Sequence, residues 1–351
     1  MDRDPVNAVA PVNATDPIRR DSALDMVKGM LVIGMLIIHS STLFLEQIEL
    51  RRLIYPDMLG FVSGSWLLVS GYLLGLHYKS SFVSTPAVIT YRLLNRGWRL
   101  VVIFVVSNLL LGRISLLDCL ANGSAARCDL TNIFLVGDGT LAFEVLLGIG
   151  YVLMFAPFIL WLSTRVMVVV VLTWVIFLSV IQAAGVKLPM LSWMLACGFA
   201  GILLGSFLHP GEVQRILIKH RGVVIFAALS FWAAYALLTQ SHVVKMTSPF
   251  FYIAQIVAIL SLLYLVGEKM LQVGWLNRPM TVMAHYSLLA YIGQIALLQF
   301  LNYLLPDESW LRGFVSSFTL VLFILLGGLY LLSYLRGRLS VVDKVYRAVF
   351  G

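Results

Sequence analysis

The sequence has 351 residues, of which 60% are hydrophobic and 12% charged, and its mean hydropathy is +0.93. Soluble domains carry charge on about a quarter of their residues, so this composition excludes an ordinary soluble domain. We interpret the net charge of +8 as a sign of membrane topology and of contact with anionic lipid headgroups, and we expect no nucleic-acid partner. Three cysteines without zinc-ligand spacing give no reason to expect a bound metal.

Ten apolar segments recur along the chain, many of them long enough to cross a hydrocarbon core of about 30 Å with about 20 residues each. They are continuously apolar rather than alternating, which argues against a β-barrel. We therefore predict an all-α, polytopic membrane protein with about ten transmembrane helices. The predicted spans are 24–45, 59–78, 93–112, 140–162, 166–184, 190–208, 222–240, 249–266, 281–303 and 314–335.

The flanking segments predict the orientation of this membrane domain, which we assign to residues 21–335. Residues 1–20 are polar and contain three prolines, a composition typical of a disordered arm. With that arm in the cytoplasm, eighteen of the 25 lysines and arginines fall in inside segments. The positive-inside rule then predicts that both termini, including a basic tail of residues 336–351, are cytoplasmic.

The first predicted span contains Lys28 and His39, eleven residues apart. On a helix they lie about 16–17 Å apart along the axis and only about 20° apart around it. An ionisable group at membrane depth is a functional candidate by default, and a histidine of near-neutral pKa can take a proton from a hydroxyl. The alternative is a structural histidine hydrogen-bonded to a neighbouring helix. Asp25, just before this apolar run, is expected to cap the helix or pair with a cation.

Two further ionisable residues lie at the predicted membrane edges. Glu144 is near the outer start of the fourth span, where it could orient His39, contact substrate, or simply sit at the water interface. His285 is near the inner start of the ninth span. Cys119 and Cys128 lie in the longest outside loop, where they could form a disulfide or remain free thiols.

Arginines recur on one face at the start of the third span. Arg92, Arg96 and Arg99 are four and three residues apart, so a helix places them together on the cytoplasmic side. Three cations on one face suit a phosphorylated ligand. The alternative is an ordinary anchor that contacts lipid headgroups.

Four of these stretches, in their order along the chain, resemble the acyltransferase-3 family of membrane acyltransferases. LDMVKGMLVIGMLIIH resembles its opening signature, in which Asp and Arg-Gly precede an apolar run that ends in His. GSWLLVSGYLLG, YRLLNRGWRL and SLLAYIGQ resemble its second-span, third-span and late patterns. The first two stretches are most similar to the branch related to periplasmic-glucan succinyltransferases.

The resemblance implies transfer of an acyl group, acetyl or succinyl, from cytoplasmic acyl-CoA to a hydroxyl of a glycan or lipid-linked acceptor beyond a bacterial inner membrane. It implies catalytic roles for His39 and Glu144, acyl-CoA binding by Lys28, Arg92, Arg96 and Arg99, and no metal. By their motif positions, Asp25, Ser70, Tyr72 and Gln294 are expected to bind substrate. A homo-oligomer in contact with membrane lipid is compatible with the sequence.

Two positions depart from the family pattern. Lys28 stands where the family has arginine, so a bidentate contact becomes a point-charge contact. Gln294 stands where the family has a histidine, and glutamine cannot transfer a proton. Two other functions therefore stay open: a transporter or flippase for a glycan or lipid, and a non-catalytic membrane subunit that binds acyl-CoA.

Overall fold

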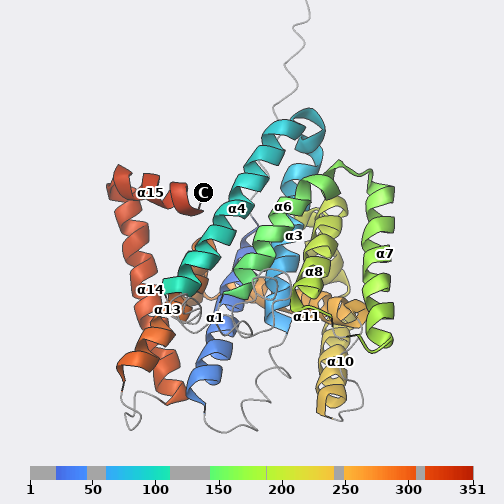
Figure 1. The fold of residues 1–351 in the computed structure, drawn as a ribbon. Helices are drawn as coiled ribbons and strands as arrows, with labels where there is room; N and C mark the ends of the chain where they lie inside the picture. Colours follow the sequence, from blue (N-terminus) through green and yellow to red (C-terminus); the bar gives the residue numbers. More distant parts are fainter. Residues whose placement is uncertain are drawn as a thin grey trace, which may run out of the picture.

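The computed structural model describes residues 21–45, 61–110, 143–186, 188–240, 249–305 and 313–350. The predicted arm at 1–20 and the loop with Cys119 and Cys128 lie outside these ranges. Every regular element within them is an α-helix, which confirms the all-α prediction (Figure 1). The helices are α1 (Ser22–Phe44), α3 (Phe61–Ser84), α4 (Pro86–Leu110), α6 (Glu144–Trp161), α7 (Thr164–Ala183), α8 (Met190–Phe207), α9 (Pro210–Lys219), α10 (Arg221–Gln240), α11 (Pro249–Met270), α12 (Gly274–His285), α13 (Ser287–Leu304), α14 (Phe314–Arg338) and α15 (Ser340–Phe350).

A long helix occupies each of the ten predicted spans. Among the described residues, seven helices are individually long and apolar enough to cross a membrane: α1, α6, α7, α8, α11, α13 and α14. An eighth is added if α9 and α10, which meet at an angle of 87°, count as one broken span. The chain is therefore a multi-pass membrane protein.

Several helices extend beyond the predicted spans or break within them. α3 continues to Ser84 and α4 already begins at Pro86, since proline suits the first position of a helix. The predicted span 281–303 is wrong at its start, since the chain leaves helical geometry at Tyr286 (φ −106°, ψ 26°) and α13 begins one residue later. His285 accordingly ends α12 rather than starting a span.

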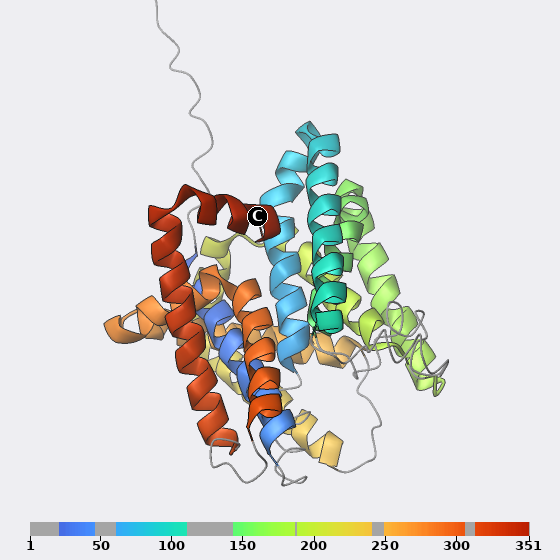
Figure 2. The same ribbon diagram turned by 60° about the vertical axis from the view of Figure 1, so that its left-hand side comes forward.

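Helix α1 lies at the centre of the bundle. Its most apolar stretch is 61% buried, against 22% for α7 and α14, which stand at the periphery (Figures 1 and 2). The Asp21 carboxylate caps the helix by accepting from the backbone N–H groups of Ala23 and Leu24, at 2.9 and 3.1 Å. We call the end of the bundle where α1 begins the Lys28 end, and the opposite end the Phe44 end.

Glycines set the closest helix contact, between α3 and α8. A Cβ atom on Gly71 would collide with the carbonyl oxygen of Gly198, and one on Gly201 would collide with that of Leu68. Gly75 and Gly205 face backbone atoms of the partner helix in the same way. Small residues of this kind let membrane helices approach closely, so these glycines set the distance between α3 and α8.

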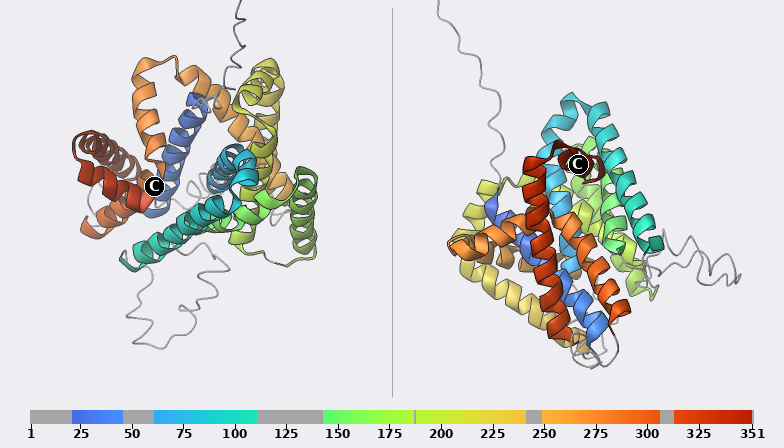
Figure 3. Two further views of the ribbon diagram at one scale, coloured as in Figure 1. Left: turned by 90° about the horizontal axis from the view of Figure 1, so that it is seen from above. Right: turned by 90° about the vertical axis from the view of Figure 1, so that its left-hand side faces the viewer.

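Helix α15 crosses the Lys28 end of the bundle, and Figures 2 and 3 show it turning from the end of α14 toward the middle. The guanidinium of Arg336 bonds the Asp343 carboxylate at 2.7 Å and stacks on the Tyr346 ring, with its Cζ 3.9 Å from the ring centroid. Hydrogen bonds from Arg336 hold the pKa of Asp343 below its usual value, and Arg347 adds to this effect. Aromatic contact between Tyr346 and Tyr286 completes the attachment.

The α3–α8 contact predicts that Gly201→Ala destabilises the protein. Inserting a methyl group against a backbone that cannot yield costs about 1–3 kcal/mol, so the melting midpoint of the detergent-solubilised protein should fall. The matched control is Gly327→Ala in α14, where nothing lies within 4 Å of a new Cβ. Tryptophan fluorescence follows the thermal unfolding of both variants. Equal melting midpoints would contradict this packing.

Candidate functional site

A cavity of about 440 Å³ runs through the bundle from the Lys28 end; we call it the central cavity. One stripe of α3 lines it with Trp66, Ser70, Leu73 and His77, eleven residues from first to last. On a helix that stripe is about 16–17 Å long. Residues of α6 and α13 face it, so the cavity is deep, narrow and largely apolar, as small-molecule sites commonly are.

Cationic side chains stand at the Lys28 end of the central cavity. Lys28 of α1 and Arg96 of α4 both line it. The Lys28 ammonium is paired with the carboxylate of Asp25, at 2.6 Å, and the two side chains are only 19% and 7% exposed. A pair this well buried fixes the direction of both groups, so Asp25 holds the ammonium at the cavity wall while Arg96 stays exposed to approaching anions.

Tyr291 of α13 closes the far part of the central cavity and separates it from His39. The Tyr291 side chain lines the cavity and is 4% exposed. Its ring centroid lies 6.2 Å from that of His39 and 6.3 Å from that of Phe143. His39 itself does not line the cavity, and its Nε2 atom is buried. The Tyr291 ring therefore lies against both the cavity and His39.

Glu144 reaches the same tyrosine from α6. It is the first residue of that helix and interacts electrostatically with Tyr291, which also hydrogen-bonds the backbone of Val145. Phe143, just before it, adopts a left-handed backbone (φ 69°, ψ 15°), a conformation that strains a residue with a bulky side chain.

Several buried polar atoms near this region lack hydrogen-bond partners among the described residues. Gln294, one helical turn beyond Tyr291, is fully buried with both Oε1 and Nε2 unpartnered. The hydroxyls of Ser40 and Ser65 and the indole Nε1 of Trp66 are unpartnered as well. Each such group costs free energy unless water or a ligand satisfies it. Of these four residues, Trp66 lines the central cavity, whereas Gln294, Ser40 and Ser65 do not.

The predicted arginine face divides in the structure. Arg96 lines the central cavity, whereas Arg92 is exposed on α4 and is not part of its lining. Arg99 donates from Nη1 to the carbonyl oxygen of Ala348, at 2.7 Å, and so caps the last turn of α15. Val349 of that turn enters the cavity mouth beside His285.

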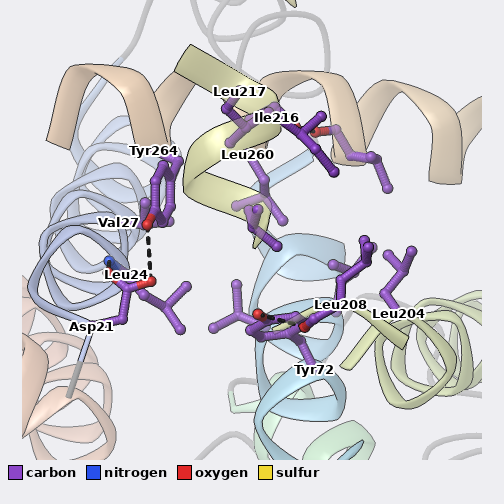
Figure 4. Close-up of a pocket in the computed structure, with 15 residues that line it drawn as sticks. Asp21, Leu24, Val27, Tyr72, Leu204, Leu208, Ile216, Leu217, Leu260 and Tyr264 are labelled. Carbon is purple, nitrogen blue, oxygen red and sulfur yellow. Dashed lines mark hydrogen bonds between the residues drawn. The ribbon is translucent and has the colours of Figure 1, made fainter. Parts of the chain in front are cut away.

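Tyr72 points away from the central cavity. Its hydroxyl donates to the carbonyl oxygen of Leu208, at 3.1 Å, and its ring lines a second cavity of about 180 Å³ on the other face of α3 (Figure 4). We call this the side cavity. Val69 lines both cavities and so lies between them.

The structure thus brings Lys28, Ser70 and Arg96 to the lining of one cavity, with Asp25 paired to Lys28, and places Glu144 and His39 near Tyr291. Tyr72, Arg92, Arg99 and Gln294 are not part of that lining. Sequence reasoning assigned no role to Tyr291, Trp66 or His77, although the first lies in a motif stretch and the other two continue the helical stripe of Ser70. A helical-wheel reading of α3 would have identified those two.

Comparison with known proteins adds nothing to this geometry: no protein-family model, no curated protein and no solved structure matches the chain. Within the described ranges, no group of three or more histidine, cysteine, aspartate or glutamate side chains could hold a metal ion.

The Asp25–Lys28 pair predicts strongly non-additive stability effects. Removing one member of a buried pair leaves an uncompensated charge, at a cost of about 3–5 kcal/mol when burial is complete and less here, because Lys28 retains some exposure. We expect the double variant Lys28→Met, Asp25→Asn to lose less stability than the two single variants lose together, so its melting midpoint should be higher than their summed shifts predict. A double-mutant cycle of melting midpoints measures this, and additive effects would show that the pair does not hold the helix start.

Proposed function

We propose that this chain is a membrane acyltransferase that moves an acyl group, acetyl or succinyl, from cytoplasmic acyl-CoA to a hydroxyl of a glycan or lipid-linked acceptor on the periplasmic side of a bacterial inner membrane. One observation carries the proposal. The central cavity connects two cationic side chains at the Lys28 end with Tyr291, whose ring contacts His39.

The distribution of lysines and arginines indicates which end of the central cavity would face the cytoplasm. In a ten-span arrangement with both termini inside, the segments at the Lys28 end carry most of the lysines and arginines, as cytoplasmic segments do. The phosphate-bearing part of acyl-CoA would enter there. Lys28 and Arg96 line the entrance, and Arg92 stands one helical turn before Arg96 on the same face.

The shape of the cavity suits the long arm of acyl-CoA. The stripe of α3 from His77 to Trp66 has a length of about 16–17 Å, with apolar walls and the Ser70 hydroxyl along the way. A thread-like chain with one thioester at its tip fits such a passage. The tip would arrive at Tyr291, within one side chain of His39.

The chemistry needs a base for the acceptor hydroxyl. His39 would take the hydroxyl proton as the oxygen attacks the thioester carbon; the carbon–sulfur bond then breaks, and the proton passes to the CoA sulfur. A transient acyl-histidine is the alternative route. Glu144 would set the position of Tyr291.

The first test separates binding from transfer. We expect Arg96→Ala to weaken binding of acetyl-CoA or succinyl-CoA to the purified protein by about tenfold, which corresponds to the loss of one charge-assisted contact of about 1.4 kcal/mol. Arg165→Ala, an exposed arginine at the start of α7, is the matched control and should bind as the unmodified protein does. Titration calorimetry measures both. Equal affinities of all three proteins for acyl-CoA would show that Arg96 does not bind it at the entrance of the central cavity.

The second test addresses His39. We expect His39→Ala to retain CoA binding and the melting midpoint but to lose acyl transfer by about 10²–10⁴-fold, the usual contribution of a general base. Mass spectrometry of glycans and lipids from cells with either protein measures transfer and names the acyl group and acceptor. If the unmodified protein and His39→Ala both bind CoA but neither yields an acylated product, the protein is a non-catalytic subunit that binds acyl-CoA. No CoA binding at all would favour a transporter.

A further inference from the structure

The side cavity has the features of a lipid-chain site. It lies at the Lys28 end between α1, α3, α8, α9 and α11, and its walls are almost entirely aliphatic (Figure 4). The described Lys and Arg side chains are absent from its lining. A cavity of about 180 Å³ with such walls is not a place for water, so an aliphatic occupant suits it.

Helix α9 forms the outer wall of the side cavity. Val213, Ile216 and Leu217 line it from this helix. Ile216 is nevertheless 48% exposed, so the cavity opens past this side chain to the outside of the bundle. α9 meets α10 at 87° and has one apolar and one charged face, as helices that lie in the plane of a membrane interface do.

The polar end of the side cavity is acidic. The Asp21 carboxylate accepts from the Tyr264 hydroxyl at 2.9 Å, and Figure 4 shows this pair at one end of the cavity. Among the described carboxylates, Asp21 alone lines the side cavity. A carboxylate at the end of an aliphatic cavity favours a cationic group beside it.

We infer that the side cavity binds one acyl chain of a membrane phospholipid whose ammonium headgroup pairs with Asp21. The aliphatic walls take the chain, the opening beside Ile216 admits it from the bilayer, and the Asp21 carboxylate selects an amine-bearing headgroup over an anionic one. This site is separate from the acyl-CoA path and holds whether or not the chain transfers acyl groups.

Matched tryptophan substitutions on α9 test where the chain binds. Ile216→Trp should fill the opening, whereas Ile218→Trp, at a residue 47% exposed on the same helix but outside the lining, should not. Native mass spectrometry of the full-length protein in detergent, titrated with phosphatidylethanolamine, gives the readout. We expect about a tenfold loss of bound lipid in Ile216→Trp, equivalent to about 1.4 kcal/mol, and none in Ile218→Trp.

A headgroup comparison tests the charge. Phosphatidylethanolamine and phosphatidylglycerol with identical chains should differ several-fold in retention by the unmodified protein, with the amine-bearing lipid favoured. Asp21→Asn should bring the two lipids to equal retention while keeping the chain bound. Asparagine caps a helix as well as aspartate does, so the start of α1 is preserved.

Three results would overturn the inference: equal lipid retention by the two tryptophan variants, a preference for phosphatidylglycerol, or an unchanged headgroup preference in Asp21→Asn. If Ile216→Trp lowers the melting midpoint, Val213→Phe on the same wall replaces it in the comparison with Ile218→Trp.

Discussion

The backbone contact between α3 and α8 is the constraint on which the rest of the structure depends. Because Gly71 and Gly201 allow the two backbones to touch, α3 is fixed in rotation as well as in position. One of its remaining faces then carries Trp66, Ser70 and His77 into the central cavity, and the adjacent face turns Tyr72 toward α8, α9 and α11. A helix pair held only by interdigitated leucines could rotate by small steps. Contact between backbones permits no such adjustment. The shape of both cavities therefore depends on the glycines of this contact, which are Gly71, Gly75, Gly198, Gly201 and Gly205.

Much of the fold could be predicted from hydropathy, because a chain that crosses a bilayer needs long apolar helices, and this chain has them. The same reasoning placed Lys28 and His39 on one uninterrupted helix, α1. Hydropathy could not predict where helices continue in water, as α4 does around Arg92, since helix propensity rather than burial decides there. Nor could it predict the break at Tyr286, which depends on contacts with Arg336 and Tyr346 that lie far along the chain.

The candidate site shows the same division between local and distant information. The spacing of three arginines predicted one cationic face, but only the position of α15 decides that Arg99 bonds the Ala348 carbonyl while Arg96 faces the cavity. His39 was recognisable as an ionisable group within the membrane, whereas its separation from the cavity by the Tyr291 ring is a tertiary fact. Gln294 stood out as a departure from a motif, and burial with two unpartnered amide atoms gives that departure a physical meaning.

Val69 has a consequence of its own, because its side chain lines both cavities. Its β-branched side chain has few rotamers, so a ligand that presses on one side of the valine changes the room available on the other. Whatever factor a ligand in one cavity imposes on the affinity of the other cavity for its own ligand must, by thermodynamic reciprocity, be returned equally. Two sites with different lining chemistry would in this way be coupled through a shared isopropyl group.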